Sequence, residues 1–199
     1  CSECGNESPK WLGKCPACNS WNTFYEQKID KYTETNKIER KIDNKPKPLN
    51  SYVGQEANRT STGYLELDRV LGGGLVNGSL ILLGGEPGIG KSTLILQLCE
   101  KVQGEGKVLY VSGEESAEQI KLRADRLDVK NDELMFLGET DIDVVKDAIS
   151  DMKPKLVIID SIQTMYSDEI SAAAGSVSQV REITSQIMRI CKAQQITTI

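Results

Sequence analysis

The residues with the clearest chemistry form the octapeptide Gly85-Glu86-Pro87-Gly88-Ile89-Gly90-Lys91-Ser92. It fits the phosphate-binding pattern G-x-x-x-x-G-K-[ST] at every fixed position. Glycines let successive backbone N–H groups point inward as an anion nest, Lys91 supplies a cation for the β- and γ-phosphates, and the Ser92 hydroxyl can ligate magnesium. We therefore predict that ATP or GTP binds here with Mg²⁺. The predicted contact residues are Gly85, Glu86, Pro87, Gly88, Ile89, Gly90, Lys91, Ser92 and Thr93.

The flanks of this loop supply the context that the pattern requires. Residues 79–84 are apolar enough for a buried strand, and apolar residues then recur at helical spacing, at Leu94, Leu98, Cys99 and Val102. A helix beginning near Lys91 would aim the positive end of its dipole at the phosphates. These flanks disfavour the alternative, which is a chance glycine-rich turn between a strand and a helix.

Two further acidic positions could complete a hydrolytic site. Asp160 ends the apolar segment 156–160, where a lone buried charge needs a cation, so we predict that it holds magnesium together with Ser92. The alternative is a carboxylate that caps the next turn. Glu114 and Glu115 follow a predicted strand at the edge where such sheets bind ligands. We predict Glu114 as the base that orients the attacking water, with Glu115 second. Alternatively, both belong to an acidic helix N-terminus.

Four cysteines near the start have metal-ligand spacing. Cys1, Cys4, Cys15 and Cys18 follow C-x₂-C-x₁₀-C-x₂-C, and two such turns can close a tetrahedral thiolate cage suited to Zn²⁺. The alternatives are two disulfides, which suit a secreted domain, or a redox pair, which would need a surrounding βαβ pattern. We favour structural zinc and expect it to fold the segment, because so small a segment cannot bury a core without metal.

Aromatic residues surround these cysteines: Trp11, Trp21, Phe24 and Tyr25. They could stack on bases or grip a partner, but we expect the two tryptophans to pack over the cysteine turns as apolar cover. Cys99 and Cys191 lie on apolar helical faces and are expected to be small core residues.

The order of elements predicts the fold class. Predicted strands at 79–84, 107–112, 134–137, 155–160 and 195–199 alternate with amphipathic helices, which indicates an α/β fold with a parallel sheet covered on both faces. Ser116 and Gln119 form a capping-box signature, and two further apolar stripes run from Ile142 to Met152 and from Val177 to Ile190. The predicted domains are a zinc ribbon at 1–25, a linker at 26–58 and an ATPase core at 59–199.

Composition narrows the classes of protein. No apolar run approaches the roughly 18 residues of a membrane span, so the chain is not expected to enter a membrane. The net charge of −5 does not advertise nucleic-acid binding. A P-loop together with further cysteines points to a reducing cytoplasm. The chain stops within a predicted strand, so we expect it to be a fragment.

Several motifs together carry a family resemblance. The segment from Ser61 to Leu75, followed by the P-loop, resembles RecA-like ATPases, particularly the branch with KaiC clock proteins and DnaB-type helicases. With the cysteine ribbon, GEPGIGKST, VSGEES, LVIIDSIQT and the segment 174–182, the chain is similar to the RadA (Sms) family of bacterial DNA-repair ATPases. Two features of that family, a K-N-R-F-G segment and a Lon-protease-like domain, would lie past Ile199.

The resemblance implies a DNA-dependent ATPase of recombinational repair that processes branched intermediates by ATP-driven movement on single-stranded DNA. It implies a homo-oligomeric ring, a hexamer, with recombinase- or helicase-type repair proteins as partners. Carried over to this sequence, Lys91 and Ser92 hold phosphate and magnesium, Asp160 the metal and Glu114 the water. The alternative is a nucleotide-switched interaction ATPase of the KaiC type, whose ribbon recruits a protein.

DNA contact is expected in the segment from Met165 to Arg181, which follows Asp160. Residues 165–176 are small and polar enough for a mobile loop, and the resemblance to RecA-like motors places a DNA-binding loop here. Ser176, Ser178 and Arg181 could contact phosphate, and Tyr166 could stack on a base. The alternative is a surface loop that leads into an amphipathic helix.

Overall fold

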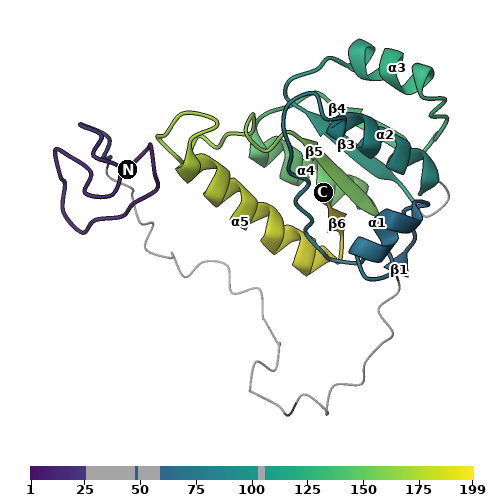
Figure 1. The fold of residues 1–199 in the computed structure, drawn as a ribbon, viewed down its shortest axis with the longest axis horizontal. Helices are drawn as coiled ribbons and strands as arrows, with labels where there is room; N and C mark the ends of the chain where they lie inside the picture. Colours follow the sequence, from purple (N-terminus) through teal and green to yellow (C-terminus); the bar gives the residue numbers. More distant parts are fainter. Residues whose placement is uncertain (26–47, 49–58, 103–105) are drawn as a thin grey trace.

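The computed structural model describes residues 1–25, 48, 59–102 and 106–199 (Figure 1). The predicted linker 26–58 lies outside the described residues, apart from Pro48. Among the described residues, no helix combines the length and the apolar character needed to cross a membrane.

A four-stranded parallel sheet forms the centre of the larger part. Its strands are β3 (Val108–Ser112), β4 (Leu134–Leu137), β5 (Leu156–Asp160) and β6 (Thr197–Thr198), in the order β4-β3-β5-β6. Strands β3 and β5 are paired along their whole length, from Val108 opposite Leu156 to Ser112 opposite Asp160. All carboxyl ends therefore lie at one edge, which places the turns after β3 and β5 next to each other.

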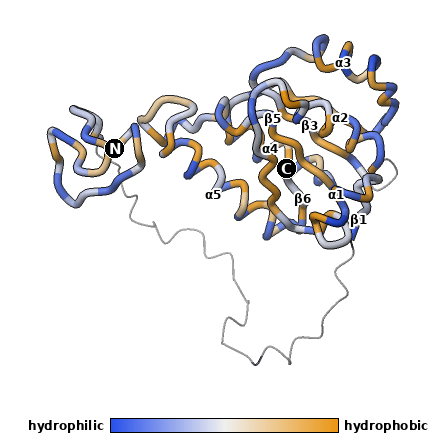
Figure 2. The backbone as a smooth tube through the Cα atoms, viewed as in Figure 1, coloured by the Kyte–Doolittle hydropathy of each residue, from blue (hydrophilic) through white to orange (hydrophobic). Residues whose placement is uncertain are grey.

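Helices cover both faces of this sheet, as predicted. Alternate strand residues point to opposite faces, so Tyr110 and Ile158 pack with helices α2 (Lys91–Lys101) and α3 (Ala117–Arg126). Leu109 and Val157 pack with α4 (Ile142–Met152) and α5 (Val177–Gln194). Figure 2 shows the hydrophobic colouring concentrated in the strands between these layers.

Local signals explain where the helices begin. The Ser116 hydroxyl accepts from the Gln119 amide while the Gln119 side chain accepts from the Ser116 amide, so the predicted capping box opens α3. Asp141 and Ser176 cap α4 and α5 through side-chain oxygens. Helix α2 differs, because its N-cap is Gly90, in a left-handed conformation with φ of 101° and no capping side chain.

A short hairpin precedes the sheet. Strands β1 (Arg59–Thr60) and β2 (Leu75–Val76) pair antiparallel around α1 (Leu65–Val70). The Asp68 carboxylate of α1 fixes the segment that precedes the helix. It accepts hydrogen bonds from the Ser61 hydroxyl at 2.6 Å and from the Thr62 amide and hydroxyl at 2.8 and 2.7 Å. The hydrogen bond from Ser61, then the one from the Thr62 amide, lowers the pKa of this carboxyl.

Two predicted strands are shorter than expected. Residues 79–84 form a single bridge, between Leu80 and Thr198, and Leu82 is 86% exposed. The strand predicted at 195–199 is β6, Thr197–Thr198, which begins later because Gln195 adopts the left-handed conformation that ends α5. The other three predicted strands agree with the structure within one residue.

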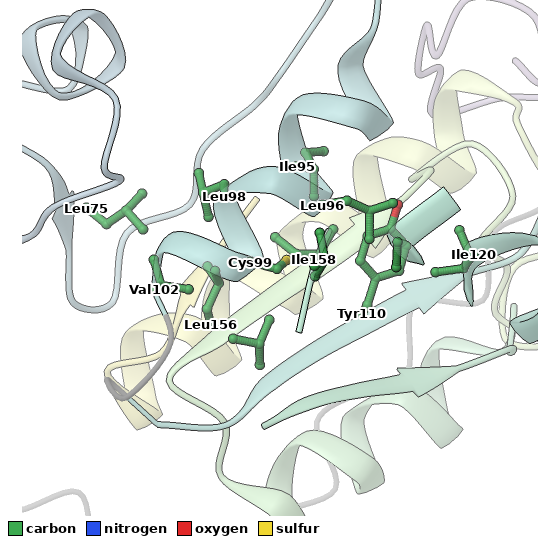
Figure 3. Packing of buried hydrophobic residues seen from close by; sticks show 13 residues of the cluster. Leu75, Ile95, Leu96, Leu98, Cys99, Val102, Tyr110, Ile120, Leu156 and Ile158 are labelled. Carbon is green, nitrogen blue, oxygen red and sulfur yellow. The ribbon is translucent and has the colours of Figure 1, made fainter. Parts of the chain in front are cut away.

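Helix α2 is anchored directly on the two central strands. Leu96 and Cys99 lie against Ile158 and Tyr110 in the buried cluster (Figure 3). Burial raises the pKa of the Cys99 thiol to about 12. Cys191 is buried among α4, α5 and the opposite face of the sheet. Both cysteines are core residues, as predicted, and the packing of α2 fixes the loop that precedes it.

Candidate nucleotide and metal sites

The P-loop is an exposed turn that leads into α2. Lys91 curls back over it, and its Nζ donates to the carbonyls of Gly85 and Glu86 at 2.8 and 3.0 Å. Because Gly90 offers no capping side chain, the backbone N–H groups of the first turn of α2 remain available to an anion. A mobile ammonium group beside uncapped amides fits a nucleotide phosphate chain.

Asp160 lies at the carboxyl end of β5, as predicted, and has a partner that the sequence did not reveal. The Tyr110 hydroxyl, which comes from β3, donates to Asp160 Oδ2 at 2.7 Å. Burial, followed by this hydrogen bond to a carboxylate, raises the pKa of Tyr110, so the phenol stays protonated and remains a donor. The bond occupies one carboxylate oxygen and fixes the orientation of the other.

Glu114 and Glu115 diverge although they are neighbours in the chain. The Ser161 hydroxyl donates to Glu114 Oε1 at 2.8 Å, so Glu114 is linked to the residue that follows Asp160. Glu115 instead pairs with Arg123 of α3 at 2.6 Å, and its amide donates to the Ser112 hydroxyl. Glu114 is exposed at the sheet edge without a cationic partner among the described residues, whereas the charge of Glu115 is compensated by Arg123.

Gly113 holds this edge together by its lack of a side chain. A Cβ at Gly113 would lie 2.5 Å from Thr140 Cγ2 and 2.5 Å from Thr164 Oγ1. Thr140 follows β4 and Thr164 belongs to the turn after β5. Three strand ends therefore meet at Gly113, in direct contact with the turn that carries Glu114.

The ribbon consists of two matching cysteine turns. The Gly5 amide donates to the Cys1 carbonyl at 2.9 Å, and the Asn19 amide donates to the Cys15 carbonyl at the same distance. In each turn, the residue after the second cysteine takes a positive φ, 72° at Gly5 and 62° at Asn19. These tight reversals place both thiols of a pair on one side of the backbone.

All four predicted ligands, Cys1, Cys4, Cys15 and Cys18, converge, with their sulfur atoms within 4.8 Å of one another. The Sγ atoms of Cys1 and Cys18 are 3.7 Å apart and those of Cys4 and Cys15 are 3.6 Å apart. A tetrahedron with Zn–S bonds of about 2.3 Å requires roughly 3.8 Å, whereas a disulfide requires about 2.05 Å. The donor set and spacing fit zinc, and all four cysteines are free thiols.

The environment of Cys15 also favours a thiolate ligand. Burial opposes ionisation, but backbone hydrogen bonds from Cys18 and Ala17 outweigh it and lower the pKa of the Cys15 thiol to about 7. The Asn6 amide lies 3.8 Å from the same sulfur, and Thr23 Oγ1 lies 3.2 Å from the Cys1 sulfur. Such outer hydrogen bonds orient metal ligands.

The expected packing of the tryptophans over the cysteine turns is wrong. Trp11 and Trp21 are 69% and 71% exposed. Backbone hydrogen bonds and the cysteine cluster hold so short a segment, which leaves no apolar interior for an indole. The Lys14 Nζ lies 5.6 Å from the Trp21 ring, a cation–π contact at the surface.

The segment 165–176 is less exposed than a surface loop would be, and its mobility stays a prediction. Met165, Ser167 and Ile170 are buried, and Tyr166 bridges Asp141 through its backbone. The cause is Gln179, a buried residue that the sequence analysis missed: its amide donates to the carbonyls of Ser167, Ile170 and Ala172. A single glutamine in a stripe of apolar residues was the available signal. Within 165–176 the exposed residues are Asp168, Glu169, Ser171, Ala173, Ala174 and Gly175.

The other predicted DNA-contact residues lie at the start of α5, beside the ribbon. Arg181 is exposed and pairs with Glu7 of the ribbon at 3.1 Å. Ser178 and Arg181 line a hollow of about 680 Å³, whose opposite wall includes Lys10 and Trp11. Ser176 caps α5. The structure therefore brings the ribbon together with the predicted DNA segment.

Comparison with known proteins defines the class. Residues 53–199 match the family model described as an AAA domain, and residues 1–26 match the one described as a rubredoxin metal binding domain. The chain belongs to the AAA-domain family of P-loop ATPases and carries a zinc ribbon at its start. ATP, Mg²⁺ and Zn²⁺ are the cofactors of these two parts.

Individual proteins similar to this chain share one name. The chain is 49% identical to DNA repair protein RadA of Bacillus subtilis over 201 residues, which cover 98% of this chain and 44% of the relative. It is 51% identical to DNA repair protein RadA of Halalkalibacterium halodurans, over 96% of this chain and 43% of the relative. For the Chlamydia muridarum protein of the same name the identity is 50%, over 100% and 44%. The chain thus spans less than half the length of these relatives.

Proposed function

We propose that this chain contributes the nucleotide site of a DNA-dependent ATPase of recombinational repair, which processes branched intermediates by ATP-driven movement on single-stranded DNA. The similarity to proteins named as DNA repair proteins supports the biological role. The observation that carries the chemistry is the position of Glu114: exposed, without a cationic partner among the described residues, and hydrogen-bonded to the residue after Asp160.

Each residue has a role that its surroundings support. Lys91 would move its ammonium group from the carbonyls of Gly85 and Glu86 to the phosphates, while the uncapped amides of α2 bind phosphate oxygens. Ser92 and Asp160 would hold the metal, with Asp160 oriented by Tyr110. ATP with Mg²⁺ supplies the phosphoryl group that is transferred to water.

Glu114 rather than Glu115 would orient the water and accept its proton. The carboxylate of Glu115 is held by its ion pair with Arg123 and points its charge at that partner rather than at a water molecule. Ser161 donates to a single oxygen of Glu114, which leaves the other oxygen available for a water molecule.

The proposal includes the domain limits: a zinc ribbon at 1–25, a linker at 26–58 and an ATPase core at 59–199.

DNA contact is assigned to residues 171–175 and the start of α5, including Ser176, Ser178 and Arg181. The Gln179 side chain donates to the carbonyls of Ala172 and Ser167, and so connects these residues to the segment that follows β5. DNA bound there would therefore displace the segment that follows Asp160. A homo-oligomeric ring would line its channel with this segment and leave the acidic surface outside. We place this protein in the bacterial cytoplasm, with recombinase- or helicase-type repair proteins as partners.

The decisive experiment measures ATP hydrolysis by the full natural protein with and without single-stranded DNA. We expect DNA to stimulate turnover, and Lys91→Ala to abolish it in both conditions because phosphate binding is lost. Arg181→Ala with a deletion of residues 171–174 should keep basal hydrolysis and lose the stimulation. An equal rate of ATP hydrolysis with and without DNA in the parent protein would refute the proposal.

A second function is favoured by one specific observation. The ribbon leaves Trp11 and Trp21 exposed, and its Glu7 pairs with Arg181 of the core. A nucleotide-switched interaction ATPase of the KaiC type, in which the ribbon recruits a protein partner, would use these features. Hydrolysis unaffected by DNA but accelerated by a purified repair protein would favour this function.

A further inference from the structure

A second hollow lies at the opposite edge of the sheet from the P-loop. Its volume is about 560 Å³, and it is formed where the chain enters β3 and β5 and where α5 gives way to β6. Its lining includes Lys107, Lys153 and Lys155, together with Ser150, Gln194 and Gln195. The distance along β5 from Lys155 to Asp160 is roughly 16 Å at about 3.3 Å per residue. The hollow is therefore separate from the nucleotide site.

Two of the three lysines are neighbours at the entries of β3 and β5, and the third lines the same hollow. Val108 is opposite Leu156, so Lys107 and Lys155 are neighbours across the strands, and the Lys155 amide donates to the Lys107 carbonyl at 2.8 Å. Like charges in such positions are destabilising. Lys153 adds a third amine from the left-handed C-cap of α4, with φ of 48°, a position that usually takes glycine or asparagine.

No carboxylate among the described residues lines this hollow, and none of the three lysines forms an ion pair with a described residue. Three other lysines of the core form ion pairs. Lys121, Lys130 and Lys146 each pair with an aspartate. In a chain of net charge −5, acidic partners are abundant, so three unpaired amines in one hollow indicate an external anion.

The lining indicates which anion. Lysine amines bind phosphate as point charges. Gln194 and Gln195 each donate one amide N–H within the protein, to Ser150 and to the Lys192 carbonyl, and keep a second N–H for a phosphate oxygen. The described residues that line the hollow include no aromatic side chain on which a base could stack. We propose that this lysine hollow binds the phosphate backbone of a nucleic-acid strand, without reading its sequence, as a second contact besides the segment 171–181. The choice of ligand rests on the proposed DNA function.

The test is the salt dependence of binding. In the full natural protein, the lysine-hollow variant replaces Lys107, Lys153 and Lys155 with glutamine, and the control variant replaces Lys121, Lys130 and Lys146 with glutamine, an identical change in charge. Fluorescence anisotropy with an oligothymidylate is measured from low to moderate salt. Each phosphate contact on a single strand contributes about 0.7 to the slope of log K against log salt. We therefore expect the slope to fall by about 2 in the lysine-hollow variant and to stay unchanged in the control.

Two outcomes would contradict the assignment. A parent protein that does not bind the oligonucleotide refutes the proposed function, and this assignment with it. A parent that binds, with equal slopes in both variants, overturns only the lysine hollow and leaves an acidic protein segment as its occupant. Binding of a fluorescent ATP analogue should be equal in all three proteins, because the P-loop lies at the opposite edge. If the triple variant unfolds, Lys107→Gln alone should lower the slope by about 0.7.

Discussion

The Ser161 hydroxyl donates a 2.8 Å hydrogen bond to the Glu114 carboxylate and thereby joins the turn after β5 to the turn after β3. Glu114 follows Gly113 at the end of β3, and Ser161 follows Asp160 at the end of β5. The bond thus connects the two carboxylates that we assign to water and to magnesium. A change at either strand end would be transmitted to the other.

The pair Glu114 and Glu115 can be separated by turnover. We expect Glu114→Gln to keep nucleotide binding and to lower the rate of hydrolysis by about 10²–10⁴-fold, because a positioned base contributes that much. Glu115→Gln serves as the matched control and should change the rate only a few-fold, since its carboxylate is engaged by Arg123. Single-turnover hydrolysis measures both. A dead Glu115 variant beside an active Glu114 variant would reverse the assignment.

Two cysteine substitutions, one in the ribbon and one in the core, test whether zinc binding and the folding of the core are independent. Cys4→Ser should abolish the one zinc ion per chain and unfold residues 1–25, while the core still binds nucleotide. Cys99→Ala should retain the zinc and destabilise the core by about 1 kcal/mol, because it leaves a small cavity beside Ile158. Metal analysis and thermal unfolding measure the two effects. Loss of nucleotide binding in Cys4→Ser would show that the ribbon supports the core.

Gln179 should be a positioning residue for the segment before α5. Gln179→Ala removes the donor to three carbonyls, two of which belong to the buried residues Ser167 and Ile170. We expect a loss of about 2–3 kcal/mol in unfolding free energy, since each buried unsatisfied polar group costs about 1–3 kcal/mol. Hydrogen exchange at residues 167–172 should accelerate. Gln186→Ala, on the same helix with one bond to Lys146, is the control and should leave that exchange unchanged.

Asp68 predicts a pH dependence of stability. Its pKa in the folded protein lies below the ordinary value, so its contribution is fully present above about pH 4 and is lost as pH falls through the folded pKa. Asp68→Asn should therefore lower stability by about 1–2 kcal/mol at pH 7 and by progressively less below pH 4. Chemical denaturation across pH measures this. Asp125→Asn, which affects only an exposed pair with Lys121, should show little effect at any pH.

Sequence reasoning worked where a local pattern decides the structure. The P-loop, the Ser116 capping box and the cysteine spacing each define a local geometry through their own backbone and side chains. The parallel sheet followed because alternating apolar segments have few other ways to be buried. The cluster of cysteine sulfur atoms agrees with the predicted metal cage.

The features that the sequence did not predict depend on contacts between segments distant in sequence. Tyr110 and Asp160 are 50 residues apart, and only the register of β3 against β5 brings them together. The burial of Met165 and the exposure of Trp11 likewise depend on what the tertiary fold offers each side chain. The strand predicted at 79–84 is reduced to a single bridge, between Leu80 and Thr198, and pairing with a distant segment is not visible in a local pattern.

Gly113 has a mechanical consequence for the ATPase cycle. Because its backbone lies against Thr140 and Thr164 with no space for even a methyl group, the turn carrying Glu114 has no clearance on that side. Any movement of the turn after β5 toward β3 must displace Glu114 as well. The two turns are therefore in direct contact and cannot move independently. Under the proposed function, a DNA strand bound at residues 171–175 would change the distance between Glu114 and the phosphate chain.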